Sequence, residues 1–241
     1  MSEKKVDKIL LNIGVPQTVI NEWEFPKKLK LAQKAKKNKK IKFVKHIEKD
    51  YYVNSEGQLE AVPKHSATGI STMSSTIPET DLTLSFDVVD LYTKYGVYGN
   101  FHWLTSVDLD GDRMGMAVNE DWNLIAGSYA CHNYWKPLAD SVWYDGGNCG
   151  GRPLTIDVYG ADWNVENFPG ENNVEAKRAK GYIYFEMSPS DPYAYRRVIS
   201  QYCHDNTSGG TSSISVTIGP LSVSHTTSSG SISKAAEDTS F

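Results

Sequence analysis

The feature that most constrains this chain is a period-two alternation of apolar and polar residues, which begins at Leu82 and continues to the C-terminal part. In LTLSFDVV, the residues Leu82, Leu84, Phe86 and Val88 fall on one face. Successive side chains of an extended strand point to opposite sides, so this pattern predicts strands with one buried face. A chain of this kind folds by burying such faces against one another.

Further short runs of the same kind follow, separated by clusters of Gly, Asp, Asn and Pro: YGNFHWL, MGMAV, NLIAGSYAC, LTIDVYG, GYIYFEM and AYRRVISQYCH. Many short strands at such spacing are typical of antiparallel sandwiches and barrels. The 14 tyrosines and 6 tryptophans favour strands as well. We therefore predict a mainly β protein, with an antiparallel β-sandwich over residues 81–241.

The N-terminal part has a different hydrophobic pattern. Residues 16–40 are helix-like in two pieces, which Pro26 separates because proline interrupts a helix interior. Residues 41–47 alternate, and residues 51–62 place a Ser-Glu-Gly turn between two extended runs, which predicts a β-ribbon. Residues 1–62 thus form a basic helix and β-ribbon region, and the Ser/Thr/Pro/Gly-rich segment 63–80 is predicted to be a linker.

Charge is unevenly distributed along the chain. Residues 1–50 contain 14 lysines and 6 acidic residues, whereas the remainder contains 11 Lys and Arg against 23 acidic residues. A basic arm on an acidic body can bind an anionic surface or nucleic acid. The arm has no arginine and only one tryptophan, Trp23, so we expect a solvated lysine face and no nucleic-acid partner.

Three cysteines are present: Cys131, Cys149 and Cys203. In an oxidising compartment, Cys131 and Cys149 form a natural disulfide and Cys203 is left over and buried. In a reducing compartment, the pairs Cys131-His132 and Cys203-His204 raise the alternative of a zinc site. Adjacent residues on a strand point to opposite faces, so each pair supplies only one ligand, and no CxxC spacing occurs.

The stretch VDLDGDRMGMAVNED (107–121) carries aspartates at alternate positions. An EF-hand needs glycine at position 6 and glutamate at position 12, but counting from Asp108 these positions hold Arg113 and Asn119. A looser calcium site built from Asp108, Asp110, Asp112 and Glu120, with Asp121 as an alternative to Glu120, stays open. The competing interpretation is the tip of a β-hairpin with Asp-Gly at its turn.

An aromatic group lies between the first two cysteines, in HNYWKPLADSVWYDGGN. Tyr134, Trp135, Trp143 and Tyr144 are candidates for a binding surface that stacks on sugar rings or inserts at a cell surface. The alternative is that these side chains anchor a loop or belong to the core.

Catalytic signatures are sparse. The chain contains no GxSxG, P-loop, HExxH or dinucleotide fingerprint. Asp87, Asp90 and Glu186 lie on strand patterns and could serve as an acid and base pair, as in a glycosidase. We expect no enzyme activity, with a secreted hydrolase as an alternative.

The last segment, TSSISVTIGPLSVSHTT (211–227), alternates most regularly. Ile214, Val216 and Ile218 share one face, and Leu221 and Val223 resume after Gly-Pro. It predicts a hairpin, or two strands that change sheets at the Gly-Pro. Pore-forming toxins insert such hairpins, although membrane strands need about 9–11 residues. Membrane activity is therefore the second hypothesis, behind a surface pair of a sandwich.

Several stretches together, namely VPQTVI, KFVKHIEKDYYVNSEGQL, YGNFHWL followed by DRMGMAV, VISQYCHD and the Ser-rich alternating tail, resemble a group of uncharacterised β-rich secreted or surface proteins of Gram-positive bacteria. The resemblance spans most of the chain. It implies an extracellular setting and carries no assigned activity, so it transfers no functional residues.

The leading expectation is a non-catalytic secreted or cell-surface protein that acts in binding or assembly, with calcium and a disulfide as stabilising features. A glycan, a cell surface, a membrane or further copies of the chain are the candidate partners. The N-terminus carries no apolar run of signal-peptide length, which leaves a cytoplasmic location as the alternative.

Overall fold

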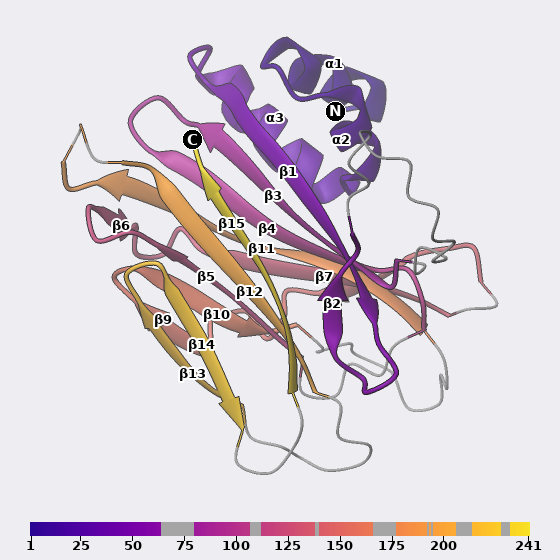
Figure 1. Ribbon diagram of the computed structural model, residues 1–241. Coiled ribbons are helices and arrows are strands. Elements are labelled where there is room, and N and C mark those ends of the chain that lie inside the picture. The colour runs from indigo at the N-terminus through magenta and orange to yellow at the C-terminus, as the bar shows by residue number, and fades with distance from the viewer. Residues whose placement is uncertain are drawn as a thin grey trace, which may run out of the picture.

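The protein is built of layers, as Figure 1 shows for the computed structural model. The structure describes residues 1–63, 80–106, 112–137, 140–165, 177–191, 193, 195–205, 214–227 and 232–241. Three N-terminal helices lie on one face of a large sheet, a second sheet packs on its other face, and a separate hairpin covers the second sheet. All strand pairs are antiparallel in the described part of the chain, so the structure is a β-sandwich as the alternation predicts.

The helical layer consists of α1 (Glu3–Asn12), α2 (Gln17–Glu22) and α3 (Phe25–Lys37). The break between the predicted helical pieces lies at Trp23 and Glu24, and Pro26 falls in the first turn of α3, where its missing N–H costs nothing. α1 was not predicted. Among the described residues, no helix is both long and apolar enough to cross a membrane.

The large sheet, called sheet A here, has the strand order β2-β1-β3-β4-β11-β7-β8, and β6 also pairs with β11. Its strands are β1 (Lys42–Val53), β2 (Leu59–Ala61), β3 (Leu82–Asp90), β4 (Tyr95–Trp103), β6 (Trp122–Leu124), β7 (Ala130–Pro137), β8 (Tyr144–Gly147) and β11 (Lys177–Pro189). β1 and β2 form the predicted ribbon, and β1 pairs with β3 from Lys42 to Tyr51. The boundary drawn between residues 1–62 and 81–241 stays a prediction, and the two parts share this sheet.

The second sheet, called sheet B here, has the order β15-β12-β5-β10-β9. Its strands are β5 (Arg113–Val118), β9 (Thr155–Asp157), β10 (Gly160–Asn164), β12 (Arg197–Asp205) and β15 (Ile232–Ser240). The Ser/Thr-rich tail forms the hairpin of β13 (Ile214–Gly219) and β14 (Ser222–Thr227), a two-stranded sheet of its own. Of the two predicted alternatives for this segment, the hairpin is the one that forms.

The main core lies between sheets A and B. The predicted apolar face of β3 enters it completely, since Leu82, Leu84, Phe86 and Val88 are all buried there. Opposite them, Met114 and Met116 of β5 face the same core. The intervening residues of β3 point to the helices, where Val89 joins a second core under α1 to α3. The central strands β3, β4 and β11 therefore contribute buried residues to both cores, one with each face.

A disulfide joins Cys131 of β7 to Cys149, which follows β8, with the Cα atoms 5.6 Å apart. Cys203 of β12 is not part of a disulfide and is fully buried. These positions confirm the disulfide interpretation of the cysteines and the burial of the third. A disulfide of this loop length stabilises a fold by about 3 kcal/mol.

Gly160 allows β10 to approach β5 closely. A Cβ atom at this position would overlap the carbonyl oxygen of Met116 and would lie 2.9 Å from the Cα atom of Ala117. Both atoms are backbone, so they cannot move aside without distorting β5. At Gly219, in contrast, a Cβ atom would meet only the Cβ atom of Ser222 at 4.0 Å.

We expect Gly160→Ala to lower the free energy of unfolding by about 3 kcal/mol, because overpacking against backbone strains the sheet. Gly219→Ala is the matched control and should change it by less than about 1 kcal/mol. Urea unfolding followed by tryptophan fluorescence measures both. Equal effects of the two substitutions would show that the two strands are not this close.

Candidate functional site

A cavity of about 250 Å³ lies between the helical layer and sheet A, and we call it the helix–sheet cavity. Glu22, Trp23, Glu24 and Lys27 form its helical wall. Its sheet wall consists of Glu48 from β1, Thr83 and Ser85 from β3, Asn100, Phe101 and His102 from β4, Tyr134 from β7, and Lys180, Gly181 and Tyr182 from β11. Ligand sites for drug-sized molecules measure about 300–1,000 Å³, so this cavity suits a smaller ligand.

A buried ion pair joins α3 to β3 beside this cavity. The Nζ atom of Lys27 lies 2.8 Å from Oδ2 of Asp87, and the two side chains are 2% and 0% exposed. The same oxygen of Asp87 accepts hydrogen bonds from Trp23 Nε1 at 3.0 Å and from Asn100 Nδ2 at 2.9 Å. Lys27 also donates to Asn100 Oδ1 at 2.6 Å. The pair is therefore surrounded by partners, which a buried charge requires.

Aromatic rings enclose the ammonium group of Lys27. The Nζ atom lies 4.1 Å from the ring centroid of Trp23, 4.5 Å from that of Tyr98 and 5.5 Å from that of Tyr182. Cation–π attraction is strongest where water is excluded, as it is here. Burial alone would raise the pKa of Asp87, but Lys27 and His46 hold it below its ordinary value. The expectation that the lysines form a solvated face is wrong for Lys27, and also for the buried Lys28, which pairs with Glu3 at 2.7 Å.

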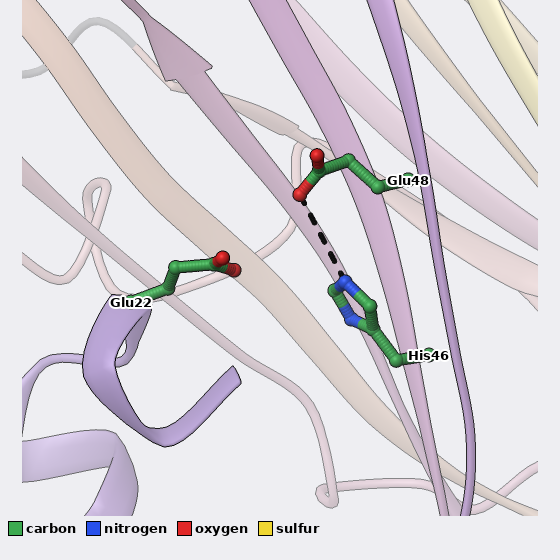
Figure 2. A group of neighbouring side chains, drawn as sticks. All are labelled: Glu22, His46 and Glu48. Atoms are coloured by element: carbon green, nitrogen blue, oxygen red, sulfur yellow. Dashed lines mark ion pairs between the residues drawn. The ribbon is translucent and has the colours of Figure 1, made fainter. Parts of the chain in front are cut away.

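His46 connects the buried pair to the exposed side of the cavity. Its Nδ1 atom lies 2.8 Å from Oδ1 of Asp87, and its Nε2 atom lies 3.8 Å from Oε2 of Glu48. Figure 2 shows that Glu22, at the end of α2, points toward these two residues of β1. Ligand atoms of Glu22, His46 and Glu48 all lie within 4.8 Å of one another. These three side chains could hold a metal ion.

The pKa values in this group diverge. The hydrogen bond to Asp87 and the neighbouring carboxylate of Glu48 raise the pKa of His46 to about 9. The nearby ring of His46 lowers the pKa of Glu48, whereas burial and the neighbouring Glu48 raise the pKa of Glu22. Burial and nearby lysines lower the pKa of His102 to about 4, so its imidazole is neutral at pH 7. His46 is thus cationic at pH 7, whereas His102 on the cavity wall is neutral.

Tyr134 carries the clearest sign of a ligand. Its side chain is 6% exposed and lines the cavity, yet its hydroxyl makes no hydrogen bond within the described part of the chain. A buried hydroxyl left unsatisfied costs about 1–3 kcal/mol. Trp143 lies beside the same cavity, because its ring is 5.6 Å from that of His102 and 4.4 Å from Nζ of Lys180.

The four predicted binding residues therefore divide into two pairs. Tyr134 and Trp143 are at the helix–sheet cavity. Trp135 instead packs on the core between the sheets, because neighbours on a strand face opposite sides. Tyr144 is 42% exposed and stacks on Trp135, with the ring centroids 5.0 Å apart. A single surface made of all four does not form.

The predicted calcium ligands are described only in part. Asp108 and Asp110 lie outside the described residues. Asp112 is buried and accepts hydrogen bonds from Tyr202 Oη at 2.5 Å and His204 Nδ1 at 2.8 Å. Glu120 is exposed beyond the other end of β5. At about 3.3 Å per residue of strand, some 25 Å of chain separates Glu120 from Asp112, so these two do not meet.

The flanking strands correct the competing interpretation of this loop. β4 precedes it in sheet A and β5 follows it in sheet B, so the segment connects the two sheets and is not the tip of a hairpin. Whether the loop binds calcium stays a prediction.

The carboxylates considered as an acid and base pair are each engaged with other partners. Asp87 is engaged with Lys27, whereas Glu186 accepts from Lys34 at 2.6 Å and from the hydroxyl of Tyr184 at 2.9 Å. Asp90 accepts a hydrogen bond from the backbone N–H of Tyr92.

Sequence reasoning missed Glu22, His46 and Glu48 as a group. The alternate spacing of His46 and Glu48 in KFVKHIEKD was the available signal, since it places both on one face of a strand.

No protein-family profile matches the chain, and no curated protein matches it in sequence. Among solved structures, the collagen-binding domain of Erysipelothrix rhusiopathiae surface protein RspB is 10% identical with a TM-score of 0.33 and covers 61% of this chain. A pore-forming protein is 8% identical (TM-score 0.30), covering 79% of this chain and 94% of its own length. Clostridium perfringens delta-toxin is 7% identical (TM-score 0.26), covering 83% of this chain and 93% of its own length.

This chain spans 45% of the length of the collagen-binding domain. Similarity at these TM-scores is too remote to indicate a ligand or an activity. The residues of the helix–sheet cavity must therefore be interpreted from their own chemistry.

The Lys27–Asp87 pair generates a stability prediction. Lys27→Met or Asp87→Asn alone should lower the free energy of unfolding by about 3–5 kcal/mol, because each leaves an uncompensated buried charge. The double variant should lose less than the sum of the two. Lys30→Met, at an exposed lysine of the same helix, is the control and should change it by less than about 0.5 kcal/mol. Urea unfolding gives all four values, and strictly additive losses would contradict the coupling.

Proposed function

We propose that this chain is a non-catalytic binding protein that works outside the cell, and that its helix–sheet cavity holds a small hydroxylated ligand such as a saccharide unit. The observation that carries the proposal is the buried, unpaired hydroxyl of Tyr134 on the wall of this cavity. A ligand hydroxyl that bonds to it would restore the lost hydrogen bond.

The remaining groups of the cavity can form the hydrogen bonds and stacking contacts that a sugar requires. Carboxylates such as Glu22 and Glu48 accept hydrogen bonds from neighbouring hydroxyls, and the neutral ring of His102 can accept or donate. The half-buried ring of Trp143 at the cavity edge offers an apolar face on which a sugar ring can stack. Ligand sites of this kind combine aromatic walls with a few fixed polar groups.

The disulfide supports the extracellular part of the proposal. Disulfides such as Cys131–Cys149 form and persist in oxidising compartments, and are rare in reducing ones. The resemblance to secreted and surface proteins of Gram-positive bacteria agrees with this location.

Tyr134→Phe tests the binding role of the hydroxyl. The probe is an array of immobilised neutral and amino mono- and disaccharides, followed by titration of the best-retained sugar. We expect the variant to bind about 3- to 10-fold more weakly, the value of one neutral hydrogen bond. Its melting temperature should be unchanged or higher, because the substitution removes an unsatisfied buried group.

Tyr144→Phe is the matched control, since that hydroxyl bonds to Asp140 at an exposed site and should not affect sugar binding. A lower melting temperature with unchanged binding would assign the Tyr134 hydroxyl a structural role. Retention of no saccharide by the wild type at millimolar concentration would reject the proposed ligand class.

A second candidate function, membrane insertion as a β toxin, is favoured by one observation. The β13–β14 hairpin pairs with no other strand in the part of the chain that the structure describes. Side chains hold it on sheet B: Val223 packs over Gly115, and His225 bonds to Gln201 at 2.8 Å and to Asp162 at 3.2 Å. Its strands of six residues each are shorter than the 9–11 needed to span a membrane, which ranks this candidate second.

Dye release from phosphatidylcholine–phosphatidylserine vesicles tests this candidate. Wild-type protein should release the dye, and a Gly115→Cys/Val223→Cys variant should not, because a disulfide would hold the hairpin on sheet B. Reductant should restore release by the variant, with wild type in the same reductant as the control. Absence of release by the wild type would exclude the toxin function.

A further inference from the structure

We propose that Glu22, His46 and Glu48 form a binding site for a divalent first-row transition metal, with Zn²⁺ as the best match, on the exposed side of the helix–sheet cavity. Glu22 and Glu48 themselves line this cavity. The site goes beyond saccharide binding and does not depend on it, because the metal can be measured alone.

The three side chains converge from two elements. His46 and Glu48 are two residues apart on β1, so they project from the same face of the strand, and Glu22 ends α2 opposite them. Their ligand atoms lie within 4.8 Å of one another, and the His46–Glu48 contact is 3.8 Å. Metal–ligand distances of about 2.0–2.2 Å place ligand atoms about 3.4 Å apart in a tetrahedral site. Rotation of the two solvent-facing glutamates closes this small gap.

The ring of His46 is already oriented for a metal. Its Nδ1 atom is held at 2.8 Å by Asp87, a fully buried carboxylate that Lys27 and Trp23 fix in turn. With the Nδ1–H bonded to Asp87, Nε2 is the ring nitrogen beside Glu48, and a metal that binds there displaces the proton that this nitrogen otherwise carries. Carboxylate–histidine–metal arrangements of this kind set the tautomer and the direction of a metal ligand.

The donor set indicates the class of metal. One imidazole nitrogen and two carboxylate oxygens suit zinc and its neighbours, whereas calcium and magnesium take oxygen ligands in larger number. Three protein ligands also leave a coordination position open, as in zinc sites that bind water or substrate. Because Glu22 and Glu48 line the cavity, a hydroxyl of a ligand in the cavity could occupy that position.

Among the described residues, three other histidine–carboxylate contacts do not belong to a group of three ligating side chains. His132–Asp145, His204–Asp112 and His225–Asp162 are pairs at 2.8 Å, 2.8 Å and 3.2 Å. Over the described ranges of the chain, Glu22, His46 and Glu48 are the group in which three ligating side chains come together. His132 is therefore a matched control: it is a partly exposed histidine beside a carboxylate that should not hold zinc tightly.

The test is isothermal titration of chelator-treated, full-length protein with Zn²⁺ alone, and with Co²⁺ for its visible absorption. Wild type and His132→Gln should each bind one ion per chain with the same affinity and show the intense bands of low-coordinate cobalt. His46→Gln and the double variant Glu22→Gln/Glu48→Gln should each weaken binding at least 100-fold and lose these bands. The double variant leaves the Asp87 network intact, so its metal-free melting temperature should match that of the wild type.

Two outcomes would overturn the proposal: no binding by the wild type at 1 mM Zn²⁺, or binding that persists unchanged in both variants. Saccharide retention is measured separately, with and without chelator. If the protein binds zinc but no sugar, the metal site stands and the proposed saccharide ligand is rejected. If it binds a sugar but no zinc, the saccharide ligand stands and the metal site is rejected.

Discussion

Lys27 and Asp87 meet where neither charge reaches water, and the position of the helical layer depends on that contact. A buried ion pair is worth little compared with a well-packed apolar contact, because desolvation offsets most of its attraction. It does, however, specify geometry: only one placement of α3 puts the ammonium group among Trp23, Tyr98 and Asp87. Lys34, two turns further along the same helix, also pairs with the sheet, through Glu186 on β11, although its side chain is 40% exposed. The helices are thus docked on sheet A at two charged points, and the helix–sheet cavity lies beside the first.

The sequence predicts the sandwich well for a physical reason. Residues such as Leu84 and Phe86 alternate with polar neighbours because one face of each strand is buried, and that pattern is local. The cavity is not local. Glu22, Asn100 and Tyr134 come together only through strand pairing and helix docking, which a single sequence does not encode in any spacing. The burial of Lys27 was equally hidden, since a lysine-rich helix usually faces solvent.

The predicted binding residues lie on both faces of sheet A, so only some of them are at the observed cavity. The aromatic stretch around Tyr134 was identified by composition, but composition does not show which side of a strand a ring occupies. Tyr134 faces the helices and Trp135 faces the other sheet. The disulfide could be anticipated, because two cysteines 18 residues apart close a short loop whatever the fold.

The place of β11 in the middle of sheet A has a consequence for biosynthesis. β4 and β7 both pair with β11, whose residues 177–189 leave the ribosome long after β4 is complete. Until then β4 has an unpaired edge, and such edges are prone to join those of other nascent chains. The same holds for sheet B, because β5 pairs with β12, which is synthesised much later. Both sheets can therefore be completed only after most of the chain has been synthesised. Fragments that end before β11 would expose strand edges that the folded protein covers.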